Sequence, residues 1–529
     1  MTDVRKNDKL STENFEKVYR EMKRRGFVEL KNPQFIEIVA KLLSSEFHVP
    51  ENYVCNVVTN ALRPFCDQLR DDIVAYLETE YVDKVYRDSY YRYYSSKASK
   101  YPRDCIRLSF FDNSSGAFSH GTTAEHTDSE VKNAYRGFLV IRPTIPKIVG
   151  RSAISPKALK NSDFVSCLVD IKTTVDGLKV NVSAFPSSSQ DTESITCAET
   201  SLWALMEYYG NKYPEYTPIK PSDVIEALRN TVVGRQLPSS GLSAECLTYA
   251  IKSFGFGPRL YHRDAFSELH NILGCYIESG IPMVTALSNR RSVVSDVEDI
   301  GHAVLCVGHE VVTDGMIDAA VASKKKPDYS PSDLIDILDF DDIEKKFVFI
   351  DDNFPPYQRD YLATPTSRYD DKSWKACEIE SIIAPLYDKI YMEPYLAKEY
   401  IRTLIKAPYF SHLCGRQITM RTYLCSTRSY RNYVWHSNMS ADMKKIISDI
   451  FMPKFVWVIE LSDIDGLKRG QVEDLILLDA TAMQTTYYEP LLVAFANQKC
   501  YFRNRNTNAL VQRAVTCGRF ASYSNLRKA

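Results

Sequence analysis

A cysteine at the start of an amphipathic helix is the residue of this chain best placed for nucleophilic chemistry. Cys197 follows a polar loop, and apolar residues recur after it at helical spacing until Gly210, which predicts that the helix ends there. Thr196 and Glu199 have the spacing of a capping box, so we expect the helix to begin at Thr196 with Cys197 in its first turn. The helix dipole and the free backbone N–H groups at that end favour a thiolate.

Two downstream segments supply the partners that a cysteine nucleophile needs. Residues 301–308 have the pattern of a short buried strand that opens with His302, and residues 347–350 form a second apolar strand that ends at Asp351 and Asp352. In a Cys-His-acid triad the imidazole takes the thiol proton and later gives it to the leaving group, while the carboxylate orients the imidazole. The order of residues along the chain is that of such a triad.

These segments resemble the papain-like cysteine peptidase superfamily, and within it the bacteriocin-processing peptidases that remove double-glycine leaders. The resemblance covers about residues 180–361 and implies a helix packed on an antiparallel sheet. It also implies that the side chain of Gln190 and the backbone N–H of Cys197 stabilise the oxyanion. Two positions depart from that branch: Gln190 lies one residue further from the cysteine, and Ala198 stands where the exporter peptidases usually carry glycine.

The identity of the acid is open between two neighbours. Asp351 and Asp352 point to opposite faces if the strand continues, so only one of them can meet His302. We favour Asp351 because it is the first acid after the apolar run. Asn353 is a weaker candidate, since papain itself uses an asparagine in this role.

The expected function is that of a cysteine hydrolase, a thiol protease or isopeptidase that cleaves peptide or isopeptide bonds through a thioester. The same thioester could serve deamidation or transglutamination, and a papain-like fold could also be a non-catalytic scaffold that binds a protein. The resemblance implies no metal and no organic cofactor. The large flanking regions suggest that the substrate is a specific protein partner.

Other chemistry-bearing residues have simpler interpretations. His120 and His126 lie in a Ser/Gly/Thr-rich loop without the helical pattern of a metalloprotease motif, so we do not expect them to bind zinc. The tyrosine-rich, basic segment 87–103 could stack on single-stranded nucleic acid, but an amphipathic helix that packs its tyrosines on the core is the favoured interpretation. Cys246 and Cys306 lie inside apolar patterns and are expected to be packing residues.

Composition limits the remaining possibilities. The 529 residues include 66 basic and 67 acidic side chains, so no net field favours nucleic acid or an anionic membrane. The N-terminus is polar rather than signal-like, and no apolar run is long enough to span a bilayer. Thirteen cysteines without short paired spacings fit reduced thiols, and we expect a cytoplasmic protein.

The pattern of helical and alternating segments predicts an α+β protein of three regions. Residues 1–165 are expected to be helical to about residue 85 and then β, and residues 166–365 to form the papain-like domain, with an exposed insertion near 311–345. Residues 366–529 are expected to form a β-rich α+β region that opens with a helical part at about 379–405. The arginine-rich end, residues 503–529, is expected to be a surface helix.

Overall fold

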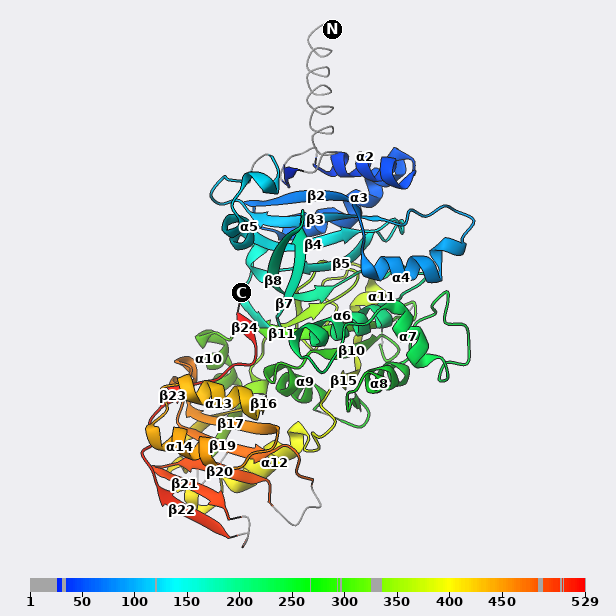
Figure 1. The fold of residues 1–529 in the computed structure, drawn as a ribbon. Helices are drawn as coiled ribbons and strands as arrows, with labels where there is room; N and C mark the ends of the chain where they lie inside the picture. The colour runs from blue at the N-terminus through cyan, green and yellow to red at the C-terminus, as the bar shows by residue number, and fades with distance from the viewer. Residues whose placement is uncertain are drawn as a thin grey trace.

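The protein is an α+β molecule built around three largely antiparallel sheets, as the computed structural model shows (Figure 1). The structure describes residues 26–30, 35–118, 121–266, 268–292, 294, 297–324, 335–483, 489–504, 507 and 509–528. The predicted α+β class is confirmed. In the view of Figure 1 the first sheet lies at the top, a central sheet lies below it, and the C-terminal sheet lies at the lower left.

The first sheet has seven strands, all paired antiparallel. In spatial order they are β1 (Phe27–Glu29), β2 (Ile73–Tyr81), β3 (Cys105–Asp112), β4 (Tyr135–Ile141), β5 (Val149–Ile154), β8 (Leu178–Ser187) and β7 (Val169–Val175). The helices α2 (Phe35–Phe47) and α3 (Glu51–Gln68) pack on each other, and their buried faces join the same hydrophobic core. The expected helix around residues 73–77 is wrong: this segment is β2. Its first six residues are all buried, and a short continuous apolar run carries no period that separates helix from strand.

The central sheet carries the strands that were expected to hold the triad. Its order is β14 (Gln358–Asp360), β13 (Phe347–Ile350), β11 (Gly301–Glu310), β10 (Met283–Ser288), β15 (Glu378–Ala384) and β9 (Arg259–His262). Two further short strands extend it: β6 (Phe164–Ser166) pairs with β11, and β24 (Arg527–Lys528) pairs with β6. The helix α6 (Cys197–Lys212) lies between β11 and strands β7 and β8 of the first sheet, so it is covered on both sides. On this helix Ala198–Tyr209 are all buried.

The C-terminal sheet also has seven strands, of which only the first pair is parallel. In order they are β12 (Asp336–Asp339), β16 (Gln417–Ser426), β17 (Phe455–Asp463), β19 (Asp474–Asp479), β20 (Leu491–Ala496), β21 (Lys499–Arg503) and β22 (Leu510–Ala514). The helices around it are α12 (Pro394–Leu404), α13 (Thr427–His436) and α14 (Ala441–Asp449), and α9 (Leu269–Glu278) packs between β11 and β16.

Two expectations for this region are corrected. Residues 378–384 form strand β15 before helix α12, and the arginine-rich end forms short strands that include β22 and β24 instead of a surface helix. Both segments gain partners far away in sequence, and local patterns do not contain that information.

The expected boundaries at 165/166 and 365/366 do not coincide with the division of strands among the three sheets. Strands β7 and β8 follow residue 166 but belong to the first sheet, whereas β15 follows residue 365 but belongs to the central sheet. The segment expected as an insertion near 311–345 carries α10 (Asp314–Ser323) and β12, which joins the C-terminal sheet; residues 325–334 of it lie outside the described residues. This segment therefore connects the central sheet to the C-terminal one.

Candidate active site

Cys197 is the first residue of α6, and the predicted cap at the helix start is confirmed. The backbone N–H of Thr196 donates to the Glu199 carboxylate at 3.1 Å, and the Thr196 hydroxyl donates to the same oxygen. Cys197 is half-buried, whereas the residues that follow it are buried. The helix continues to Lys212 instead of ending at Gly210. A side chain at Gly210 would meet Pro218 at 2.5 Å, so the glycine permits a close approach.

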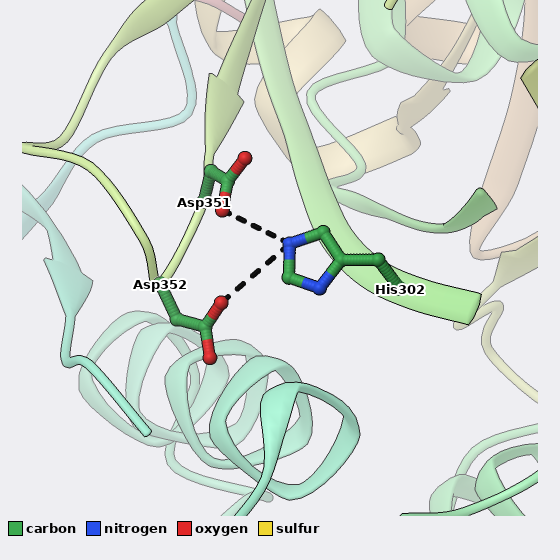
Figure 2. Close-up of side chains that lie close together, drawn as sticks. All are labelled: His302, Asp351 and Asp352. Atoms are coloured by element: carbon green, nitrogen blue, oxygen red, sulfur yellow. Dashed lines mark hydrogen bonds and ion pairs between the residues drawn. The ribbon is translucent and has the colours of Figure 1, made fainter. Parts of the chain in front are cut away.

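His302 comes from the second position of β11 and lies beside both predicted acids. Its side chain is only 2% exposed, and its Nε2 lies 3.0 Å from Asp351 Oδ1 and 3.6 Å from Asp352 Oδ1 (Figure 2). His302 also makes a hydrogen-bond contact with Cys197. Because Nε2 faces the two carboxylates in Figure 2, we infer that this contact uses Nδ1. The helix carrying Cys197 is fixed to this strand by the Ser201 hydroxyl, which donates to the Ala303 carbonyl at 3.1 Å.

Asp351 has the contacts of an orienting acid. Its Oδ1 accepts from His302 and from the backbone N–H of Asn353 at 3.0 Å, while its Oδ2 accepts from the Tyr369 hydroxyl at 2.8 Å and from the Arg368 guanidinium. Both oxygens are thus held in place. Burial acts to raise the pKa of Asp351, but the charges and hydrogen bonds of His302 and Arg368 outweigh it and keep this pKa well below its ordinary value.

Asp352, the next residue, differs from Asp351 in its hydrogen bonds and in its pKa. Its Oδ1 lies 3.6 Å from His302 Nε2 and the backbone N–H of Gln190 faces it, but neither oxygen accepts a hydrogen bond of ordinary geometry from a described residue, and its side chain is 3% exposed. Burial raises the pKa of Asp352 to about 6; the charge of His302 and the backbone N–H of Gln190 act in the opposite direction, and the charge of Asp351 adds to the rise. The two neighbours are therefore not equivalent: Asp351 is fully paired and Asp352 is not.

The same contacts define the protonation of His302. Burial acts to lower the pKa of His302, but the charge and hydrogen bond of Asp351, the contact with Cys197 and the charge of Asp352 raise it well above its ordinary value. The imidazolium form is therefore stabilised beside the cysteine, as a thiolate–imidazolium pair requires.

Gln190 is half-buried at the start of the loop that leads to Cys197, and its backbone N–H faces Asp352. The loop is organised by Asp191, whose Oδ1 accepts from the backbone N–H groups of Glu193, Ser194 and Ile195 at 3.0, 2.7 and 2.9 Å. Within it Thr192 has φ +67°, a left-handed conformation that a β-branched residue rarely adopts. One carboxylate thus fixes the backbone between Gln190 and the helix.

Several residues around the site were not anticipated from the sequence. Trp374 lies edge-on to the His302 ring at 5.1 Å and is stacked on Tyr369 at 4.4 Å, so it shields the imidazole. Arg368 spans Asp351 and Asp360 from a loop with no regular pattern. The only local signal was the cluster of aromatic and charged residues at 368–374.

The tyrosine-rich segment packs on the loop before Cys197. Tyr93 donates to the Glu193 carboxylate at 2.6 Å, and Lys97 pairs with the same carboxylate. Within the segment 87–103, Tyr94 is buried, Tyr90, Tyr93 and Tyr101 are half-buried against the core, and Tyr91 is exposed, so the expected packing of its tyrosines on the core holds for four of the five.

The rival histidine site of the Ser/Gly/Thr-rich loop is only partly described, and the other candidate cysteines lie in a strand and a helix. His120 lies outside the described residues; His126 packs against the rings of Phe27 and Phe118. Among the described residues, the one group of three or more potential metal ligands is His302, Asp351 and Asp352. Cys306 is fully buried in β11, as expected of a packing residue, and Cys246 is half-buried in α8 (Ala244–Ser253).

Taken together, the arrangement places a thiol, a buried imidazole and a paired carboxylate in series, which is the set of groups that nucleophilic acyl transfer uses. None of the helices in the described part of the chain combines the length and apolar character that crossing a bilayer requires. No protein-family model matches the chain, and no curated protein matches it.

Proposed function

We propose that the protein is a cysteine-nucleophile hydrolase that cleaves a peptide or isopeptide bond of a protein partner, with a papain-like catalytic domain. The observation that carries the proposal is the position of His302, whose Nε2 pairs with Asp351 at 3.0 Å while the ring also contacts Cys197. The helix that begins at Cys197, packed on an antiparallel sheet, supports the papain-like assignment. The thirteen unpaired cysteines support a reducing, cytoplasmic location.

In the proposed reaction Cys197 is the nucleophile, His302 moves the protons and Asp351 orients His302. His302 takes the proton of Cys197, and the thiolate attacks the carbonyl carbon to form a tetrahedral oxyanion. His302 then gives that proton to the departing amine, which leaves a thioester on Cys197. Water, deprotonated by His302, cleaves the thioester and restores the thiol. Asp351 keeps the imidazole oriented throughout.

The proposal is tested by looking for the thioester itself. We expect that a library of peptides and isopeptides, quenched in acid within the first turnovers, leaves an acyl group on the peptide that contains Cys197. Intact-mass and peptide mapping would detect it. Absence of any adduct while turnover proceeds would contradict the proposal. The leaving group and added amines separate the outcomes for the same intermediate: chain cleavage with release of the free acid indicates a peptidase, release of ammonia with formation of the acid indicates a deamidase, and transfer to the added amine indicates a transglutaminase.

The oxyanion role of Gln190 gives a second prediction. Gln190→Ala is expected to slow acylation by about 100- to 1,000-fold, because one oxyanion donor is lost. Alkylation of Cys197 by iodoacetamide should stay nearly unchanged, because alkylation builds no oxyanion. Stopped-flow acylation and mass-detected alkylation measure the two rates.

A matched control is Gln236→Ala, because Gln236 is also a half-buried glutamine. Its loop lies beside the loop before Cys197, since the backbone N–H of Ser239 donates to the Glu193 carbonyl at 2.8 Å. We expect it to leave acylation within a few-fold of the unaltered protein. If Gln190→Ala slowed both reactions equally, Gln190 would have to be assigned a structural role in the loop.

A further inference from the structure

Asp352 is a buried carboxylate that the proposed reaction does not use. Its side chain is 3% exposed, it points toward the Nε2 side of His302 (Figure 2), and neither oxygen accepts a hydrogen bond from a described residue. Burying a carboxylate without hydrogen bonds is costly, so such groups are usually paired with a cation or coordinate a metal. The described ion-pair partner of Asp352 is His302 Nε2 at 3.6 Å, which leaves its oxygens available to coordinate a cation.

The distances around Nε2 suit a metal ion. One ligand atom from each of His302, Asp351 and Asp352 lies within 4.8 Å of the others, and the Nε2–oxygen distances are 3.0 and 3.6 Å. Tetrahedral zinc has Zn–N and Zn–O bonds of about 2.0 to 2.2 Å, which separates its ligand atoms by about 3.3 to 3.5 Å. The two observed distances lie on either side of that value, and since no two of the three ligand atoms are more than 4.8 Å apart, side-chain rotations can bring all three to it.

We propose that His302, Asp351 and Asp352 form a site for a divalent zinc-like cation, and that the bound cation switches the enzyme off. The binding part of this proposal stands on the geometry alone, whereas the inhibition rests on the proposed function. The cation takes the place of a proton at Nε2, which leaves to solvent, and the ring keeps a proton on Nδ1. Loss of that Nδ1 proton would leave a metal-bound imidazolate, so the ring no longer gives it readily to the departing amine and acylation slows.

The surroundings select the kind of cation. Zinc accepts imidazole nitrogen and carboxylate oxygen ligands in a four-coordinate site, whereas Mg²⁺ and Ca²⁺ prefer six or more oxygen ligands. Two carboxylates balance the charge of one divalent ion. Arg368 and Tyr369 contact Oδ2 of Asp351, the oxygen that faces away from His302, so they hold the carboxylate and leave Oδ1 for the ion. A water molecule would complete a tetrahedron.

The test uses the full chain with Cys197→Ala, which removes the thiol as a metal ligand and makes the result independent of catalysis. We expect isothermal titration with Zn²⁺ to show one site, and Co²⁺ to give the visible absorption of a tetrahedral complex. Adding Asp352→Asn should weaken binding by at least about tenfold, because one of three protein ligands is lost. The matched control is His412→Gln, which alters the other short histidine–aspartate pair, with Asp474 at 2.7 Å. It should bind zinc as before.

Two results would overturn the site: no stoichiometric zinc binding by the Cys197→Ala protein, or equal binding with and without Asp352→Asn. Asp352→Ala serves as a second variant if the first does not fold, and the rise in melting temperature on adding Zn²⁺, absent with Mg²⁺, gives an independent measure of binding. In the protein with Cys197 present, zinc should slow acylation of that thiol in the acid-quench experiment. Zinc that binds without slowing it would overturn the inhibition alone. Failure of the proposed function, seen as turnover without an adduct at Cys197, leaves the binding result untouched, so the two failures can be told apart.

Discussion

Replacing Cys197 by alanine is expected to remove acyl-transfer turnover, by about 1,000-fold or more, while the protein stays folded. The loss is large because the thiol is the group that forms the covalent bond, and it is the thiol in hydrogen-bond contact with His302. The fold should persist because Cys197 is half-buried at a helix start whose cap is made by Thr196 and Glu199. Turnover on any substrate from the peptide library and circular dichroism measure the two effects.

Cys246 is the matched control for this experiment. It is also half-buried and also lies in the first turn of a helix, where its backbone N–H donates to the Ser243 hydroxyl at 3.3 Å. Iodoacetamide should therefore modify Cys197 at least about tenfold faster than Cys246, because only Cys197 has an imidazolium partner. Cys246→Ala should leave turnover unchanged. Equal alkylation rates for the two thiols, or full turnover by Cys197→Ala, would exclude Cys197 as the nucleophile.

The parts of the site that could be predicted are those encoded by neighbours in sequence. The helix start at Cys197 follows from Thr196 and Glu199, which are three residues apart and meet within a single turn. The strand with His302 and the strand before Asp351 are continuous apolar runs, and such runs are legible without knowing what they pack against. The expectation that only one of Asp351 and Asp352 can meet His302 is wrong, because β13 ends at Ile350 and strand alternation does not continue to the two acids, which both lie beside Nε2.

What could not be predicted depends on contacts between distant segments. Tyr93 and Glu193 are separated by 100 residues, yet one donates to the other beside the nucleophile. Arg368 and Tyr369 come from an irregular loop, and only the tertiary fold turns them toward Asp351. The same limit explains β2 and β15. The apolar runs at 73–77 and 379–384 are strands because they have sheet partners, and neither run contains a period that says so.

Asp351→Asn is expected to lower the acylation rate constant by about 1,000- to 10,000-fold. The effect of Asp352→Asn on the same rate constant is expected to be at least about tenfold smaller. An asparagine at 351 keeps the shape of the side chain but loses the charge that orients His302 and stabilises its imidazolium. Asp352 lies 3.6 Å from Nε2, beyond hydrogen-bond distance, so its replacement removes a weaker interaction. Single-turnover acylation with each variant measures the difference.

Asp360→Asn separates orientation of His302 from simple disruption of the arginine site. Asp360 is the second carboxylate that holds Arg368, but it does not contact His302. If Asp351 acted only by anchoring Arg368, Asp360→Asn would slow acylation as much as Asp351→Asn does. We expect instead that Asp360→Asn lowers the free energy of unfolding, because Arg368 loses one of its two carboxylates in a buried site, while acylation falls by no more than about tenfold.

A larger loss for Asp352→Asn than for Asp351→Asn would reverse the assignment and make Asp352 the orienting acid. The proposed cation site contains both acids, so under either assignment Asp352→Asn would still have to weaken zinc binding by the Cys197→Ala protein.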